Sequence, residues 1–231
     1  MASHKKETVQ TSDGLDLIVE VDVPAFPPRG VVILLHGWSG SPRHFDRNIS
    51  ALITSGYIAL FGPERLATHT FVDQVPLQNR DPATGWTLGS RGIFDGPSLA
   101  AVRAALVADA AAAAADTVDV CLTRRPPAAD AAAFVAEATR ADGAWLGRLM
   151  ADHTALDWRP LLRAWRGGPV LVVVGGATKC HDPAGVRAVG ELIGSDATTV
   201  EMEGGSHWCY WEDAPAFNKV LLAFLEGKAS E

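Results

Sequence analysis

His207 is the residue in this chain whose type and surroundings best suit proton transfer. It lies in the segment GGSHWCYWE, where paired glycines allow a turn that exposes the imidazole and aromatic residues can shield it from water. General-base catalysis near neutral pH requires a pKa of about 7, which histidine has without perturbation. A lone histidine is more often structural or solvated, so both interpretations of His207 stay open at this point.

A second segment with possible chemistry is His36-Gly37-Trp38, which follows the apolar run VVILL. That run, residues 31–35, is continuously β-branched or leucine, which indicates a strand covered on both faces in a parallel sheet. A His-Gly pair after such a strand is as consistent with a simple sharp bend as with a functional site. Its meaning therefore depends on what the rest of the chain supplies.

The elements that must position these residues alternate between strands and helices. Two partly alternating segments around Asp13-Gly14 predict a β-hairpin. A helix is expected over residues 42–53, with Ser41 as its N-cap and Pro42 in the first helical position. The alternation predicts an α/β fold with a mostly parallel sheet and flanking helices. The other expected strands are GYIALFG, HTFVDQ, PVLVVVGG and ATTVEM, and the other expected helices are residues 95–116, about 129–153, VRAVGELI and AFNKVLLAFLE.

The block from residue 80 to 165 has no strand pattern of its own, which indicates a helical insertion over one edge of the sheet. We interpret it as a lid. The predicted organisation is a core formed by residues 1–79 and 166–231, with residues 80–165 as the helical lid.

Composition limits the classes of partner. The chain has 231 residues, enough for one domain, and a formal net charge of -7 with no like-charge block longer than Lys5-Lys6. We therefore expect no nucleic-acid partner and no basic membrane-binding face. The apolar runs are too short or too weakly hydrophobic to span a bilayer, and the first ten residues lack the apolar region of a secretory signal.

The cysteines favour a reduced, cytoplasmic protein. Cys121, Cys180 and Cys209 are three in number and show no CxxC spacing, so neither a disulfide framework nor a zinc module is expected. His181 and Asp182 are adjacent, but no second pair at ligand spacing accompanies them, and there is no glycine-rich phosphate loop. We therefore expect no metal and no cofactor.

The strand ending in HGW, the strand ending in GG after a helical insertion, and the late GGSHW before a final helix together resemble the α/β-hydrolase fold superfamily. The resemblance covers essentially the whole chain except one internal gap, and TFVDQVPLQNR, GWTLGSRGIFD and GATKCHDPAGVRAVGELI are similar to a bacterial and fungal subgroup of hydrolases. It implies that Gly37 forms a close turn, that Trp38 supplies an oxyanion-binding N–H and a wall of the acyl pocket, and that His36 braces the loop. It also implies that His207 is the general base.

The acid that would orient His207 is less evident. The family places it after the strand written here as VLVVVGG, where this chain has Thr178, while Asp182 lies four residues farther on at the start of a helix. The fold also tolerates an acid after the preceding strand, and TFVDQ puts Asp73 at such a strand end. We prefer Asp73 to Asp182, although an aspartate there could also simply cap a turn.

The nucleophile elbow of the family, GxSxG, is missing. GWSGS has the wrong spacing, and ITSGY has no glycine two residues before its serine. Residues 46–68 are also too few for the helices and strands that the fold places there, which need more than about 40 residues. Either GYIALF is a strand after the first helix, or SGYIALFGPERL is the helix that follows the lost elbow; we prefer the second interpretation.

The gap has consequences for the sheet, because VVILL would lose the two neighbours that the family's strand order gives it. We expect either a rearranged sheet in which VVILL pairs directly with TFVDQ, and so a reduced number of strands, or a marginal and aggregation-prone product.

Three functions remain. The first is slow hydrolysis of a small apolar ester, lactone or related carbonyl substrate by Gly37, Trp38, His207 and Asp73. The second is a catalytically dead member that binds a small-molecule ligand or a partner, and the third is an inactive, internally deleted product. Cys180, beside Lys179, is a rival nucleophile, although a reduced cysteine is more often inert packing. The sequence leaves the oligomeric state open.

Overall fold

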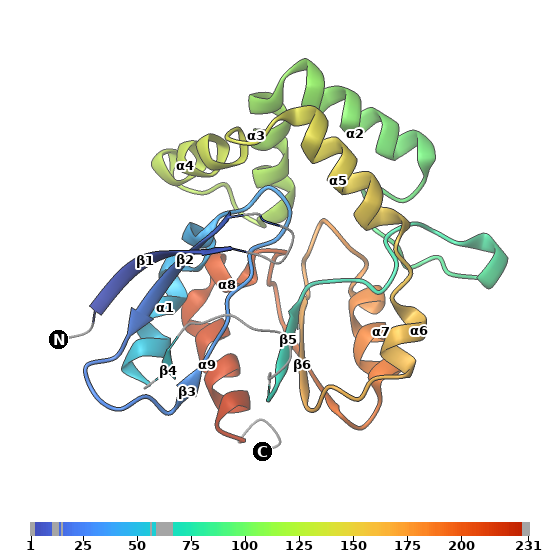
Figure 1. Cartoon of the computed structure of the whole chain (residues 1–231). Helices are drawn as coiled ribbons and strands as arrows, with labels where there is room; N and C mark the ends of the chain where they lie inside the picture. The colour runs from blue at the N-terminus through green and yellow to red at the C-terminus, as the bar shows by residue number, and fades with distance from the viewer. Residues whose placement is uncertain (1–2, 11–13, 15, 56, 59–66, 228–231) are drawn as a thin grey trace.

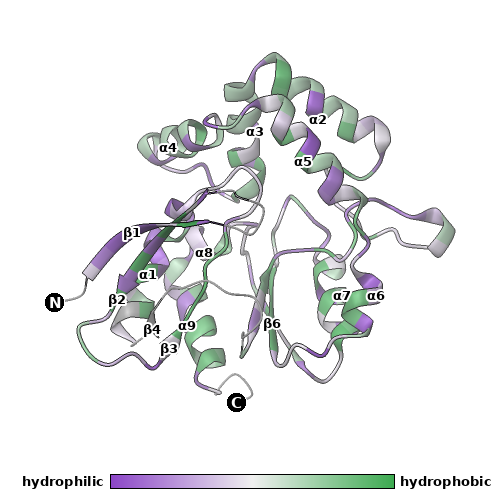
Figure 2. Cartoon of the chain, viewed as in Figure 1, coloured by the Kyte–Doolittle hydropathy of each residue, from purple (hydrophilic) through white to green (hydrophobic). Residues whose placement is uncertain are grey.

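The computed structural model describes residues 3–10, 14, 16–55, 57–58 and 67–227. The predicted hairpin opens the chain: β1 (Ser3–Gln10) pairs antiparallel with β2 (Asp16–Val23), and Gly14 has a φ of 86° between them. β1 is hydrophilic and exposed along its whole length, whereas the final helix α9 (Ala214–Leu225) is largely hydrophobic (Figure 2). β1 therefore lies outside the core, whereas β2 buries Val19 and Val21 and α9 buries Phe217 and Leu221.

The parallel pairing predicted from the sequence is confirmed, and the α/β class with it. β5 (His69–Val72), β6 (Val170–Gly175) and β7 (Ala197–Met202) form one parallel sheet in the order β5-β6-β7. β3 (Gly30–Val31) and β4 (Tyr57–Ile58) form a separate parallel pair. The described strands thus form three separate sheets, the antiparallel hairpin and two parallel sheets.

β6 is the centre of the core because every residue in it is buried. Successive side chains of a strand point to opposite faces, so its two faces meet different partners. Leu171 and Val173 belong to a cluster with aromatic residues of α8 (Cys209–Glu212) and α9, whereas Val172 packs in a second cluster with α7 (Pro183–Ile193). The expectation of a fully buried strand here is confirmed.

The run VVILL differs from its prediction. Only Val31 of the run is in a strand, Val31 and Leu35 are 53% and 71% exposed, and β3 pairs with β4 rather than with β5. The direct pairing of VVILL with TFVDQ is therefore wrong, because β3 pairs with β4 and residues 32–35 belong to no strand. The preferred interpretation of SGYIALFGPERL as a helix is also wrong at Tyr57–Ile58, which form β4; residues 59–66 lie outside the described residues.

The first helix begins later than predicted. A 3₁₀ turn at Pro42–Phe45 precedes α1 (Asp46–Thr54), and the side chain of Ser41 makes no capping hydrogen bond. The long helix predicted over 95–116 is two helices, α2 (Gly96–Ala108) and α3 (Ala110–Cys121), because Asp109 leaves helical geometry and its carboxylate accepts from the N–H of Ala112. An aspartate inside an alanine run was the signal for this break.

The helices α2, α3, α4 (Ala128–Ala138) and α5 (Gly143–Ala155) gather at one end of the molecule, at the top of Figure 1. α6 (Arg159–Arg163) and α7 lie on one side of β5 and β6, and α9 lies on the other. Residues 80–165 contain no named strand, as predicted. Among the described residues, none of the helices combines the length and apolar character that a bilayer crossing requires.

Candidate active site

Asp73 follows β5 and is turned out of the strand ladder by its backbone. Its N–H still donates to the carbonyl of Val173 at 2.8 Å, but its φ of 47° lies in the left-handed region. Aspartate is among the few residues other than glycine that enter this region readily. The strand therefore ends on a residue whose carboxylate points toward the neighbouring strand end instead of continuing the pleat.

The Asp73 carboxylate is completely buried and fully engaged. Oδ1 accepts from the N–H of Gly175 at 3.0 Å, and Oδ2 accepts from Thr178 Oγ1 at 2.7 Å. Oδ2 also accepts from Nδ1 of His207 at 2.8 Å. A buried carboxylate is stable only when charged or polar partners satisfy it, and here three donors do so, two from the end of β6 and its turn and one from the turn of His207.

His207 reaches Asp73 because two turns pack backbone against backbone. A Cβ added to Gly175 would lie 2.4 Å from the carbonyl oxygen of Ser206, so only glycine fits at the end of β6. The N–H of Ala177 donates to the carbonyl of Gly205 at 2.8 Å and joins the same two turns. The GG pair after β6 and the GG pair before His207 thus serve a close approach of two turns.

The hydrogen bond with Asp73 fixes the proton on the imidazole. A carboxylate only accepts, so Nδ1 of His207 carries the hydrogen and Nε2 of the neutral ring keeps its lone pair. Burial lowers the pKa of His207, but the hydrogen bond to Asp73 and the charges of Cys180 and Asp73 outweigh it and raise the pKa above 6.5. The ring is therefore a stronger base than a free imidazole, with Nε2 available for chemistry.

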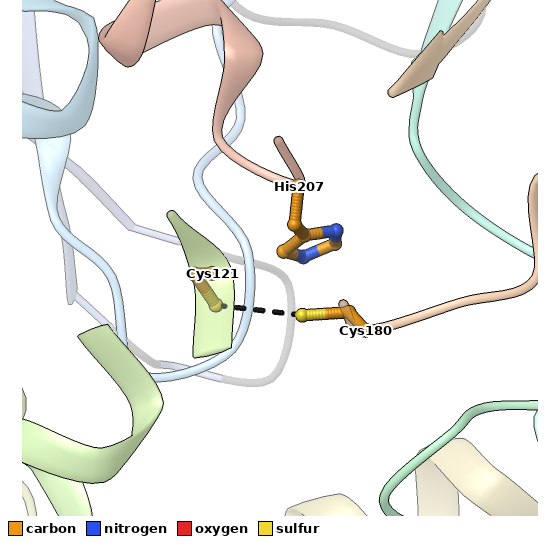
Figure 3. A group of neighbouring side chains, drawn as sticks. All are labelled: Cys121, Cys180 and His207. Atoms are coloured by element: carbon orange, nitrogen blue, oxygen red, sulfur yellow. Dashed lines mark hydrogen bonds between the residues drawn. The ribbon is translucent and has the colours of Figure 1, made fainter. Parts of the chain in front are cut away.

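Two thiols lie beside this ring. Cys121 is the last residue of α3 and Cys180 lies in the turn after β6, and their sulfurs are 3.8 Å apart. A ring nitrogen of His207 lies within 4.8 Å of both sulfurs, and Figure 3 shows one ring nitrogen facing them. Sequence spacing could not reveal this group, because its members come from three distant segments.

His181 is the other histidine at the site. Its ring centroid is 5.3 Å from that of His207 in an edge-to-face arrangement. Its pKa is lowered to about 3, mainly by burial and secondly by the repulsion of His207. Its Nδ1 is buried without a hydrogen-bond partner among the described residues. Asp73, His181 and His207 form one group whose spacing could hold a metal ion, and Cys121, Cys180 and His207 form another.

The loop around Gly37 and Trp38 is tied to other parts of the molecule. Trp38 Nε1 donates to the carbonyl of Leu146 on α5 at 3.0 Å, and His36 Nδ1 contacts the carbonyl of Gly37 at 3.0 Å. No hydrogen bond joins Gly37 or Trp38 to Asp73 or His207 in the part of the chain that the structure describes.

The steric requirement in this loop falls on Gly40 rather than on Gly37. A Cβ on Gly37 would meet nothing within 4 Å, whereas one on Gly40 would lie 3.1 Å from both the Gly37 carbonyl oxygen and His44 Cε1. Gly37 is part of the turn, because its carbonyl accepts from the N–H of Gly40 at 3.1 Å, and its oxyanion role stays a prediction. His44 stacks edge-on against Trp208, the neighbour of His207, with ring centroids 4.7 Å apart, so the loop is connected to the histidine turn by packing.

Of the residues weighed as the acid, Asp182 has a different role, because it is the N-cap of α7 and accepts from the N–H of Ala184 at 2.9 Å. Thr178 stands where the resemblance expected an aspartate, and its hydroxyl donates to Asp73 instead. Sequence reasoning missed this role of Thr178. The signal was available, because a threonine in that turn can bind an acid delivered from the next strand.

A groove with a volume of about 520 Å³ lies elsewhere, between α2 and α5. It contains neither Asp73 nor His207, and Arg103 is its only charged residue. Its lining is Ala100, Arg103, Ala104, Val107, Ala108, Ala144 and Gly147.

Solved structures share this fold over nearly the whole chain. An esterase from Exiguobacterium antarcticum superposes with a TM-score of 0.80 at 12% identity, covering 95% of this chain and 98% of that chain. A bromoperoxidase from Bacillus anthracis gives 0.77 at 14% identity, covering 96% and 100%. An enol-lactonase from Burkholderia xenovorans gives 0.64 at 15% identity, covering 97% of each chain.

No protein-family model matches the sequence, and no curated protein is similar to it at a significant level. Identities of this size establish the fold alone. The chain has the α/β-hydrolase fold, as the sequence motifs predicted.

Proposed function

We propose that the protein hydrolyses small, largely apolar esters or lactones, with His207 as general base and Asp73 as the acid that orients it. The observation that carries the proposal is the 2.8 Å hydrogen bond from His207 Nδ1 to a completely buried carboxylate. This bond leaves Nε2 as the nitrogen that accepts a proton, which is the arrangement that histidine-dependent acyl transfer requires.

Gly37 and Trp38 are the proposed oxyanion donors in this scheme, through backbone N–H groups of the loop after β3. Support comes from the connection of that loop to the histidine turn through His44 and Trp208. Residues 80–165 are the proposed lid over the core of residues 1–79 and 166–231. The hydrogen bond from Trp38 to Leu146 on α5 would make the loop respond to the position of those helices.

The substrate class follows from the chemistry and from the named neighbours. A base and an oxyanion loop act on an electrophilic carbonyl, and the similar structures include an esterase and an enol-lactonase. A net charge of -7 disfavours polyanionic partners, so the proposed partner is a neutral small molecule and not a nucleic acid.

Turnover is expected to be slow if His207 acts on water directly. General-base catalysis contributes about 10²–10⁴-fold by itself, and in the described residues no serine hydroxyl hydrogen-bonds to His207. We expect measurable hydrolysis of activated esters and little hydrolysis of unactivated ones.

The alternative is a ligand-binding protein without catalysis. The groove between α2 and α5 favours it, because its lining is mostly alanine and contains no acid–base pair. A ligand bound there would lie away from Asp73 and His207.

The test is hydrolysis of p-nitrophenyl acetate by the wild-type chain and a His207→Ala variant. The matched control is His4→Ala, because His4 is an exposed histidine whose side chain is 57% accessible and which can react without a site. We expect His207→Ala to lose about 10²-fold or more in kcat/KM while His4→Ala is unchanged. Equal hydrolysis by all three proteins would refute the catalytic assignment.

A further inference from the structure

The two thiols beside His207 differ in accessibility. Cys121 is buried, whereas Cys180 and His207 are only partly buried. Of these two sulfurs, that of Cys180 is therefore the more accessible to a substrate. The third cysteine, Cys209, has no exposed surface.

The position of Cys121 is held by the backbone and not by the thiols. Lys179 Nζ donates to the carbonyls of Asp119 and Leu122 at 3.0 and 2.7 Å, which caps the C-terminus of α3. The N–H of Trp208 donates to the carbonyl of Cys121 at 3.0 Å. The end of α3 is thereby joined to the turn that carries Cys180 and to the turn that carries His207.

Cys180 is fixed from the other side. Its N–H donates to Thr178 Oγ1 at 3.2 Å, and its carbonyl accepts from the N–H of Arg91 at 2.8 Å. Thr178 is the residue that also donates to Asp73. One short turn thus holds both the partner of the acid and the more accessible thiol, which is the pre-organisation that a nucleophile requires.

The thiols are also electrically unequal. The hydrogen bond between them and then burial raise the pKa of Cys121 well above 9, so Cys121 is the thiol that keeps its proton more firmly. The thiol of Cys180 also donates to the carbonyl of Val120 at 3.7 Å. The hydrogen bond with Cys121 lowers the pKa of Cys180, and His207 and Lys179 act in the same direction against burial and Asp73. Of the two sulfurs, Cys180 is the one that becomes the thiolate, and thiolates are the reactive form.

We propose that Cys180 is the nucleophile of this site, completing a Cys180–His207–Asp73 set in place of the missing serine. The proposal rests on the proposed function, because it assigns the attacking atom of the same ester hydrolysis. Geometry supports it, because a ring nitrogen of His207 lies within 4.8 Å of the Cys180 sulfur (Figure 3). The other ring nitrogen, Nδ1, is hydrogen-bonded to Asp73. Cys121 is a positioning residue that acts through Cys180.

Besides the ester, water is the one reactant that the proposed reaction consumes. The Cys180 thiol first gives its proton to Nε2 of His207, which forms a thiolate and an imidazolium. The thiolate attacks the ester carbonyl carbon, a C–S bond forms, and the carbonyl electron pair moves to oxygen. Collapse of this oxyanion breaks the C–O bond, and the leaving alkoxide takes a proton from Nε2 of the His207 imidazolium, which gives an acyl thioester and an alcohol. Water then gives a proton to Nε2 as it attacks the thioester, the C–S bond breaks, and the acid departs while thiolate and imidazolium are restored.

The experiment treats the reduced full chain with p-nitrophenyl acetate, quenches it in acid and locates the acetyl group by peptide mass spectrometry. We expect one acetyl group on Cys180 and none on Cys209, whose pKa burial raises to about 12. Cys180→Ala and Cys180→Ser should each lose about 10²-fold or more in kcat/KM, and Cys209→Ala should stay within about threefold of wild type. Circular dichroism of each variant checks that it folds, and iodoacetamide treatment of the wild type provides a test without substitution.

The outcomes separate this inference from the proposed function. If His207→Ala loses activity while folded Cys180→Ala retains it, His207 acts on water and the nucleophile assignment is overturned. If alkylation modifies Cys180 and activity persists, the assignment is overturned as well. Stoichiometric zinc that a chelator removes together with activity would also overturn it, because two thiolates and an imidazole suit that metal.

The role of Cys121 has its own readout. In Cys121→Ala the hydrogen bond that lowers the Cys180 pKa is lost, so the pH midpoint of Cys180 alkylation should move upward. The charged groups that still face Cys180 are His207, Asp73 and Lys179, and they are unchanged in this variant. An unshifted midpoint would contradict the positioning role.

Discussion

Replacing Asp73 by asparagine tests the geometry of the site with the smallest change of shape. Asparagine has nearly the same volume and also tolerates the left-handed φ of 47° at this position. The N–H of Gly175 donates to Oδ1 at 3.0 Å, so the amide oxygen of the variant must take that place. The amide NH₂ then faces His207 and Thr178, which are 2.8 and 2.7 Å from Oδ2 in the wild type.

The magnitude follows from the tautomer. Nδ1 of His207 would have to accept from the amide, which moves the ring proton to Nε2 and removes the lone pair needed for base catalysis. The loss should equal the whole contribution of the base, about 10²–10⁴-fold in kcat/KM, or about 3–5.5 kcal/mol in the activation free energy. The assay is p-nitrophenyl acetate hydrolysis, combined with ¹⁵N NMR of the imidazole to identify the protonated nitrogen.

The comparison variant is Thr178→Val, which removes one donor to the same carboxylate oxygen and the acceptor of the Cys180 N–H but leaves the bond to His207. It should cost about 1–3 kcal/mol in the free energy of unfolding and less than about tenfold in kcat/KM. Wild-type activity in the folded Asp73→Asn variant, or equal losses in both variants, would refute the reasoning.

Three further predictions concern the pKa of His207, the contact between the turns at Gly175 and Ser206, and the amide exchange of residues 32–35. The NMR titration midpoint of His207 should lie above 6.5 in the wild type and lower in Asp73→Asn, where burial remains but the raising interactions are lost. Because folding raises the pKa of His207, its pairing with Asp73 stabilises the protein fully below about pH 6.5, and this contribution is lost as pH rises through the folded pKa. The free energies of unfolding of wild type and Asp73→Asn, measured with denaturant, should therefore converge toward high pH. Gly175→Ala should destabilise the fold by about 1–3 kcal/mol or more in the same measurement, since its Cβ would lie 2.4 Å from the Ser206 carbonyl oxygen; an unchanged midpoint would show that the two turns are not in contact. Amide hydrogen exchange should be fast in residues 32–35 and slow throughout β6, and equal protection of the two segments would contradict the exposure of Leu35.

The sequence was sufficient where a pattern is local. The apolar run of β6 predicted a strand buried on both faces, which the structure confirms. The choice of Asp73 came from the resemblance, and the contact that the structure gives it with His207 joins residues 134 apart in the chain. The sequence pattern was misleading for VVILL. An apolar run indicates that a strand would be stable between two neighbouring strands, but it does not show whether the chain supplies those neighbours. Val31 and Leu35 are exposed in this chain.

The thiol pair shows a different limit. Cys121 and Cys180 are 59 residues apart, and they meet because Lys179 and Trp208 hold the end of α3 against the two turns. No spacing in the sequence encodes that contact. It depends on where a helix ends, and the break at Asp109 that divides α2 from α3 also lay inside a run predicted as one helix.

The capping of α3 by Lys179 has a consequence for how this architecture can be altered. Excising residues 80–165 and closing the gap with a short linker would remove the carbonyls to which Lys179 Nζ and the Trp208 N–H donate. The ammonium and the amide, which are next to Cys180 and His207 in the chain, would then have to hydrogen-bond to water. The helical block is thus not an interchangeable module. A graft from another protein would have to reproduce the last turn of that helix, whatever else it changed.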